Sequence, residues 1–422
     1  MSGEQTLLAR TALSITCALV SILVVRSEKL LSLTKSRFDR LVLWVFAGSR
    51  LGIFVFVFFV LHLPPRGDIT IYSEEAGFAR AGLLPYGGFY SSYAPLHPYL
   101  DAALMTIWHS PLVLIFFAIS LEYLVVSLWM GISRNFFGEE TVRLATLLYA
   151  TSGVSVQFVT IDGQNNIAIS LLLVLALESL WRTREIRSGL AIGFGVAAVK
   201  FLPLLYVPVY FLAAQCRRKL ILGVAWPVAF VYGTCLFLHL PILQPFVREG
   251  YMRSPGDLPY LVEVLTGWSI PSALTSIVLL TVLAAVFFKL VAAIRNASSE
   301  TRMQIVTFGM AALTMSLVLF AKKSWPAYLI LTWFPICLTV ASRSFSKIAI
   351  FALFNVVAVV EHSYWATVIG QYPSLHTHLQ LLMGSSHTEF FLLMQIALLA
   401  VYLWILSLTF KQIAGTDLIP KI

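Results

Sequence analysis

The chain has 422 residues, of which 59% are hydrophobic and only 12% are charged. Soluble domains carry about 25% charged residues, so this composition excludes a soluble globular protein and indicates a polytopic membrane protein. The net charge of +9 does not indicate a nucleic-acid partner, because the basic residues cluster in short loops between apolar runs, as orientation signals do.

Apolar runs that approach the roughly 20 residues needed to span a bilayer as a helix recur along the chain. The first, Leu7–Val25, is either a span or a helix that lies in the interface, and no small-residue cleavage site follows it, so a cleaved signal peptide is not expected. Further spans are predicted at Leu41–Leu63, Pro111–Met130, Thr141–Thr160, Asn165–Trp181, Lys219–Leu240, Ser269–Val291, Met303–Phe320, Ala327–Val340, Lys347–Glu361 and Phe390–Phe410. We expect an all-α membrane protein of about 11 to 13 transmembrane helices, with residues 1–422 forming a single domain.

Basic residues set the expected orientation. Residues 1–40 are expected to form an N-terminal helix and a basic loop that stays in the cytoplasm, which places the polar loop 64–110 on the opposite side of the membrane. The alternation of spans brings further polar positions to that extracytoplasmic side, namely Asp162, Pro241–Trp268, Lys322–Trp325 and His362–His387. The chain is therefore expected in a plasma, inner or endoplasmic reticulum membrane.

The segment Gly189–Ala213 has arginines or lysines at both ends and two internal prolines, Pro203 and Pro208. This pattern predicts a broken hairpin of two short helices with both ends in the cytoplasm. Lys200 lies close to the break, where a lysine must pair or reach water. It either ties the hairpin to free carbonyls or reaches the phosphate of a lipid.

Loop 64–110 is the polar segment most indicative of chemistry. Asp68 follows the predicted span by five residues, which puts a carboxylate at the water boundary. The residues after it have amphipathic spacing (Tyr72, Glu75, Ala76 and Ala79), which predicts a helix along the membrane surface beside Asp68. Glu74 is interpreted as solvated. The downstream segment LLPYGGFYSSYAPLHPYL is rich in aromatic and turn residues and is suited to a sugar-binding wall, with Tyr72, Tyr86 and Tyr93 as candidate substrate contacts.

Three segments together resemble a known group of enzymes. GDITIY followed by AGLLPY and YAPLHPYL looks like the first extracytoplasmic loop of GT-C glycosyltransferases, which take sugars from polyprenyl-phosphate donors. The segment from DGQNN to VKFLP is similar to the signature of glycosyltransferase family 87. AKKSWPAYLILTWFPI resembles a segment of polyprenyl-phosphate-mannose-dependent mannosyltransferases.

The resemblance implies an inverting hexosyltransferase, with mannose as the expected sugar, in which Asp68 is the catalytic base. It also gives Gln164 a substrate-binding role, beside the alternative that residues 162–166 simply cap a helix. Trp325 and Tyr328 are further substrate-binding candidates from the third motif. Some relatives have a histidine at the position of Trp325, so no role of that histidine is carried over. The implied partners are the membrane, a polyprenyl-phosphate-linked sugar and a lipid or glycan acceptor.

A carboxylate that accepts the proton of the acceptor hydroxyl needs cations opposite it to stabilise the leaving phosphate. The extracytoplasmic candidates are Lys322, Lys323, Arg248 and Arg253, with Lys200 as a further one. Ordinary loop charge is the alternative for each, and the adjacent pair Lys322 and Lys323 is favoured.

No metal site is predicted. The position two residues after Asp68 is Thr70 rather than a second acid, and the histidines His362, His376, His378 and His387 lack helical metal-ligand spacing. The chemistry requires no cofactor and leaves a divalent metal open. Two alternative functions remain at this point, a transporter or flippase of lipid-linked sugar, which would need a similar polar cavity, and a scaffold subunit, which would not need Asp68.

Overall fold

The computed structural model describes residues 3–250, 252–369 and 386–415. Regular structure within them is helical, apart from one isolated β-bridge between Pro85 and Phe89. The helices preceding residue 200 are α1 (Gly3–Val25), α2 (Glu28–Leu31), α3 (Lys35–Val55), η1 (Phe56–Val60), α4 (Asp68–Arg80), α5 (His97–Ile107), α6 (Leu112–Ser133), α7 (Glu139–Ala150), α8 (Gly153–Ser155), η2 (Val156–Ile161), α9 (Asn166–Trp181) and α10 (Glu185–Ala198). Those following it are η3 (Leu202–Tyr206), α11 (Val207–Ala213), α12 (Arg217–Phe237), α13 (Gln244–Glu249), α14 (Leu258–Thr266), α15 (Ser272–Ile294), α16 (Ser299–Phe320), η4 (Pro326–Thr332), α17 (Trp333–Val340), α18 (Phe345–Tyr364), η5 (Trp365–Ile369) and α20 (Ser386–Gly415).

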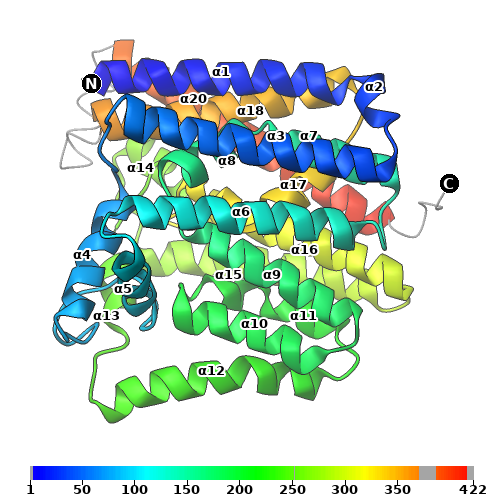
Figure 1. Ribbon diagram of the computed structural model, residues 1–422. Coiled ribbons are helices and arrows are strands. Elements are labelled where there is room, and N and C mark those ends of the chain that lie inside the picture. The colour runs from blue at the N-terminus through cyan, green and yellow to red at the C-terminus, as the bar shows by residue number, and fades with distance from the viewer. Residues whose placement is uncertain (1–2, 251, 370–385, 416–422) are drawn as a thin grey trace.

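Eight helices in the described residues are long and apolar enough to cross a membrane. The pair formed by α7 and the segment Gly153–Ile161 is a ninth candidate, bent by 46° at its break, and three shorter apolar helices accompany them. These helices run largely side by side, while α4 and α5 lie at one end of the bundle (Figure 1). The all-α polytopic fold expected from composition is therefore confirmed.

For the open alternative at residues 7–25, α1 favours a span, because it packs against α18 and lies alongside the other long helices (Figure 1). It is 23 residues long, enough to span a bilayer. The expected basic loop of residues 1–40 needs a correction, because α3 already begins at Lys35. Three of the basic residues, Lys35, Arg37 and Arg40, lie exposed in the first turns of that helix rather than in a loop.

The predicted break in Gly189–Ala213 is present. Helix α10 ends at Ala198, the chain turns through residues 199–201, and a 3-10 turn (η3) leads into α11. Gly189 and Gly193 let α10 lie directly on α12, since a Cβ at Gly189 would approach the carbonyl oxygen of Leu220 to 2.1 Å. Glycine is therefore needed at this helix crossing, which fixes the hairpin that carries Lys200.

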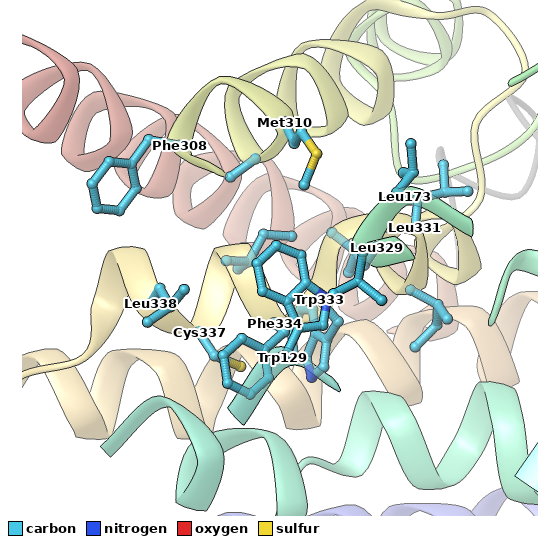
Figure 2. Close-up of a cluster of buried hydrophobic side chains, with 14 of the residues drawn as sticks. Trp129, Leu173, Phe308, Met310, Leu329, Leu331, Trp333, Phe334, Cys337 and Leu338 are labelled. Carbon is cyan, nitrogen blue, oxygen red and sulfur yellow. The ribbon is translucent and has the colours of Figure 1, made fainter. Parts of the chain in front are cut away.

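The core lies around α16. Of the most apolar stretch of this helix, 89% is buried inside the protein, compared with 17% for the corresponding stretch of α15. Figure 2 shows the aromatic side chains that fill the space between α6, α16 and α17. Trp129 stacks on Phe334 with ring centroids 5.5 Å apart, and Trp333 stacks on Phe351 at 5.3 Å. The interior next to α16 is consequently filled by side chains.

One ion pair is buried between the long helices. Arg50 of α3 and Glu122 of α6 approach to 3.4 Å, and both side chains are almost completely excluded from solvent. Arg50 also donates to the Ser155 hydroxyl at 2.7 Å, while the Tyr149 hydroxyl donates to Glu122 at 3.2 Å. Each charge therefore has its partners inside the protein.

Candidate functional site

Asp68 is the first residue of α4, and Gly67 makes that position accessible. Gly67 has φ 69° and ψ −141°, a conformation that residues with a side chain rarely adopt, and the chain turns there from the loop after η1 into the helix. The Asp68 side chain is partly exposed. The GD pair of the first motif is thus a turn glycine that presents a carboxylate at the start of a helix.

The predicted amphipathic helix is α4, and its predicted inner face is buried. Tyr72, Glu75, Ala76 and Ala79 are all buried, whereas Glu74 is exposed, as expected. The helix packs against α5. Glu75 accepts a hydrogen bond from the Ser91 hydroxyl at 2.7 Å, and burial raises its pKa to about 7.

Gln164, in the turn before α9, contacts Asp68 at the start of α4. Its amide Nε2 donates to Asp68 Oδ2 at 3.1 Å, and the Tyr72 hydroxyl donates to the same oxygen at 3.4 Å. None of the described residues donates to the other carboxylate oxygen, Oδ1. The site geometry therefore orients Asp68 through one oxygen and leaves the second for a ligand.

The approach of Gln164 depends on the residue before it. Gly163 has φ 58°, and a Cβ at this position would meet the side chain of Ile69 at 2.5 Å. The turn follows the π-helical segment η2, a distortion that is frequent at functional sites. Glycine therefore allows the turn 162–165 to contact the start of α4, which explains the GQ pair of the second motif physically.

Lys200 enters the same site from the tip of the broken hairpin. Loop backbone is hydrogen-bonded to this tip, from Ala94 N to Val199 O at 3.1 Å and from Leu96 N to Ala197 O at 3.2 Å. The Lys200 ammonium lies 4.9 Å from the centre of the Tyr93 ring and 5.7 Å from that of Tyr328. It makes no ion pair or side-chain hydrogen bond with the part of the chain that the structure describes.

Electrostatics link Lys200 to Asp68 and to Lys323. Burial lowers the pKa of Lys200 to about 8, and the Asp68 carboxylate acts in the opposite direction. The pKa of Lys323 is also lowered to about 8, first by burial and then by the charge of Lys200. Two ammonium groups and one carboxylate thus act on one another, an arrangement that suits an anion bound beside a base.

The structure separates the adjacent pair Lys322 and Lys323. Lys322 donates to the Ile270 carbonyl at 2.6 Å and lies 3.7 Å from the fully buried Glu263, which also binds Arg253. Lys323 instead forms an ion pair with Glu249 and shares the electrostatic environment of Lys200 and Asp68. The two neighbouring lysines therefore have different partners and different electrostatic surroundings.

Three further predicted residues, Arg248, Tyr86 and Trp325, contact aromatic or backbone neighbours. The Arg248 guanidinium lies over the Tyr90 ring at 4.4 Å and is exposed. Tyr86, which has φ 68°, donates its hydroxyl to the Tyr93 carbonyl at 2.5 Å and so supports Tyr93 from behind. Trp325 packs edge-on against His362 at 5.7 Å.

His97 belongs to the site although no role is predicted for it from the sequence motifs. Its ring stacks on Tyr93 at 4.7 Å, its Nε2 lies 2.8 Å from the Asn165 amide, and its Nδ1 lies 3.1 Å from Asp101. Burial, and then the charge of Lys200, lowers the pKa of His97 to about 3, so the ring is neutral. The YAPLHPYL motif contains this residue, and its i, i+4 spacing to Asp101 was the available signal.

Of the four histidines expected in one loop, the structure describes the side chain of His362 alone. His362 lies in the last turn of α18, because that helix continues to Tyr364 rather than ending at Glu361. His376 and His378 fall outside the described residues, and the structure describes only the backbone of His387. Within the described ranges, no three His, Cys, Asp or Glu side chains are grouped as metal ligands would be.

Comparison with known proteins identifies the family. The sequence model of glycosyltransferase family 87 matches residues 93–319, which include Tyr93, Gln164 and Lys200 and begin after Asp68. One similar solved structure is that of ArnT from Cupriavidus metallidurans bound to undecaprenyl phosphate, with 12% identity, a TM-score of 0.47 and coverage of 87% of this chain and 77% of that one. No curated protein matches the sequence. Since the family model matches more than half of the chain, the protein belongs to glycosyltransferase family 87 and is a membrane glycosyltransferase of the GT-C type that its sequence motifs predicted.

Proposed function

We propose that the protein transfers one hexose, mannose in the first instance, from a polyprenyl-phosphate-linked donor to a lipid or glycan acceptor, with inversion at the anomeric carbon. The observation that carries this proposal is the Asp68 carboxylate, held through one oxygen by Gln164 and Tyr72 and lying within electrostatic reach of Lys200 and Lys323. A general base and an anion site are the two parts that such a transfer needs.

The proposed step involves only the acceptor, the donor and these side chains. Asp68 Oδ1 accepts the proton of the acceptor hydroxyl as its oxygen attacks the anomeric carbon. The bond between that carbon and the donor phosphate breaks, and the lipid monophosphate leaves with the negative charge, which Lys200 and Lys323 stabilise. Tyr328, which is partly exposed beside Lys200, supplies an aromatic face for the sugar, whereas the buried Tyr93 ring is stacked on His97 and contacts Lys200.

Lys200 is assigned the principal contact with the phosphate because its ammonium has no carboxylate partner among the described residues. Lys323 must exchange its ion pair with Glu249 for the phosphate, so it is the second contact. Lys322 and Arg253 are assigned a structural role, since both bind the buried Glu263.

The test uses purified full-length protein, polyprenyl-phosphate-mannose and extracted membrane lipids, followed by mass spectrometry. The proposal predicts a product heavier than its acceptor by one hexose, together with free polyprenyl phosphate, and a strongly reduced yield of both with the Asp68→Asn variant. Matched donors carrying glucose or galactose identify the sugar. Movement of intact donor across a liposome membrane without a new glycosidic bond would instead favour the transporter alternative.

The site is proposed to face the extracytoplasmic side, as the basic residues near α3 and α10 indicate. In a variant without the native cysteines, Glu74→Cys is expected to react with an impermeant thiol reagent added outside intact cells, and Arg187→Cys is not. Both positions are exposed, so the comparison depends on sidedness rather than on burial. The opposite labelling pattern would reverse the orientation.

A further inference from the structure

One apolar cavity has Arg66 in its wall, two residues before Asp68, and takes no part in the transfer step proposed above. It is a cavity of about 220 Å³ between α1, the end of α3 with η1, the loop to residue 66, and the end of η2. Its lining is almost entirely apolar, with Ala9 and Leu13 on one side and Phe56 on the other. The three charged residues in its wall are Arg10, Arg66 and Asp162.

The position of α1 explains why this cavity exists. Helix α1 packs against α18, α7 and α8 and leaves a gap toward α3 at the end of the bundle where Asp68 lies. Phe56 and Leu61 line this gap and are also exposed on the surface, which in a membrane means contact with lipid. An apolar cavity open to the bilayer is suited to a hydrocarbon chain.

The charges at the cavity favour an anionic headgroup. Arg10 is neutralised by Asp162, with nitrogen and oxygen 3.0 Å apart. Arg66 is exposed, donates a hydrogen bond to the Thr6 hydroxyl at 3.4 Å, and has no carboxylate partner in the described part of the chain. The lining therefore has one excess positive charge, carried by a guanidinium, the group that best matches phosphate geometry.

The positive charge of Arg66 lies close in the chain to Asp68, the proposed base. Arg66 precedes Asp68 by two residues, which span at most about 7 Å. The cavity is lined from α1, from α3 with η1 and from the loop that leads to Arg66, whereas Lys200 lies on the hairpin of α10 and η3. In an inverting transfer, acceptor and leaving phosphate occupy opposite faces of the sugar, so two separate anion sites around one base suit two lipid substrates.

We propose that this cavity binds the acceptor, and that the acceptor is an anionic, hydroxyl-bearing phospholipid. One acyl chain occupies the space between α1 and α3, the phosphate contacts Arg66, and a headgroup hydroxyl reaches Asp68. This assignment rests on the proposed function, because it takes the phosphate of the donor to lie at Lys200.

The test is photolabelling of the purified full-length protein by diazirine-bearing phosphatidylglycerol, with phosphatidylcholine of the same chains as the matched probe. Labelled peptides from residues 3–25 and 53–66 are expected, with phosphatidylglycerol the stronger label. Ala9→Trp fills the cavity and should reduce this labelling to background, whereas Leu8→Trp, on the same helix and 69% exposed outside the lining, should not. Arg66→Gln should remove the preference for phosphatidylglycerol, and because Arg66 is exposed, this variant is expected to fold.

Labelling that is confined to other helices, or that is unchanged in both Ala9→Trp and Arg66→Gln, would overturn the assignment. Displacement of the label by polyprenyl phosphate would also overturn it, since the cavity would then hold the donor chain. These readouts need no turnover. A wild-type protein that is labelled as expected but forms no glycosidic bond would contradict the proposed function and leave the lipid site standing.

Discussion

Two groups of charges, the Arg50–Glu122 pair and the Asp68–Lys200 site, differ in where their partners come from. Arg50 and Glu122 are almost fully buried and satisfied by each other, by Ser155 and by Tyr149. Lys200 is partly exposed and has aromatic rings but no carboxylate or hydrogen-bond acceptor within the described chain. The first group needs no further partner, whereas we propose that the second binds an anion.

The difference also separates cations that look alike in sequence. Lys322 and Lys323 are neighbours, but Lys322 contributes to a closed group around Glu263, as Arg50 does around Glu122. Lys323 interacts with Lys200 and Asp68. Position in a loop therefore does not decide the surroundings of a cation, since Lys322 is held at Glu263 whereas Lys323 pairs with Glu249 and shares the electrostatic environment of Lys200 and Asp68.

The largest expected effect comes from removing one member of the buried Arg50–Glu122 ion pair. Arg50→Met leaves Glu122 buried without its cation, which should cost about 3 to 5 kcal/mol of stability. Thermal unfolding in detergent is the measurement. The double variant Arg50→Met with Glu122→Leu is the control and should recover most of the loss, because an apolar pair of similar volume needs no charge partner. Full stability of the single variant would contradict the structural role.

Substitutions at the Asp68–Lys200 site should change activity rather than stability. Lys200→Ala removes a charge-assisted contact with the donor phosphate, worth about 1.5 to 3 kcal/mol, or roughly ten- to a hundredfold in kcat/KM for the donor. Steady-state kinetics with polyprenyl-phosphate-mannose test this, and Lys200→Arg, which keeps the charge, should lose less. Unchanged donor kinetics in a folded Lys200→Ala protein would place the phosphate elsewhere.

The neighbouring lysines offer a matched pair for the same comparison. Lys323→Ala should lower kcat/KM for the donor about tenfold, because one of two phosphate contacts is lost. Lys322→Ala should leave the donor KM near the wild-type value and lower the unfolding temperature, because Glu263 loses one of its two cations. Equal kinetic effects of the two substitutions would show that the separation of the side chains has no functional meaning.

The smallest expected effect is a pH dependence. Lys200 has its pKa lowered to about 8, so it is charged below this pH and loses its proton as the pH rises through it. Since kcat/KM reports the free enzyme, its value for the donor should fall about fivefold between pH 8 and pH 9. Because Lys323 also has its pKa lowered to about 8, Lys200→Arg should reduce this decrease, and Lys200→Arg combined with Lys323→Arg should abolish it. A wild-type profile that stays flat over this interval would contradict the role of Lys200.

The local features of the site could be predicted from the sequence. The buried face of α4 follows from the spacing of Tyr72, Glu75, Ala76 and Ala79, and the hairpin break follows from its prolines and flanking charges. Both are decided by residues close together in the chain. The polar loops on one side of the predicted spans also meet in the structure, as the contact between Gln164 and Asp68 shows.

The pairing of distant charges could not be predicted in the same way. Glu263 lies 59 residues before Lys322, and nothing in either segment specifies their contact. Arg50 and Glu122 both fall inside predicted spans, where the sequence gives burial but no partner. Helix packing decides these pairs, and the gap between α1 and α3 likewise depends on how whole helices pack.

The central claim is that Asp68 removes the proton from the acceptor. Asp68→Asn keeps the size of the side chain and can keep an oxygen toward Gln164 and Tyr72, but it lacks a base. The turnover number should therefore fall by about 10² to 10⁴ with little change in donor binding. Glu74→Gln, at an exposed position on the same helix, is the control and should stay near wild type. A folded Asp68→Asn protein with wild-type turnover would contradict the account.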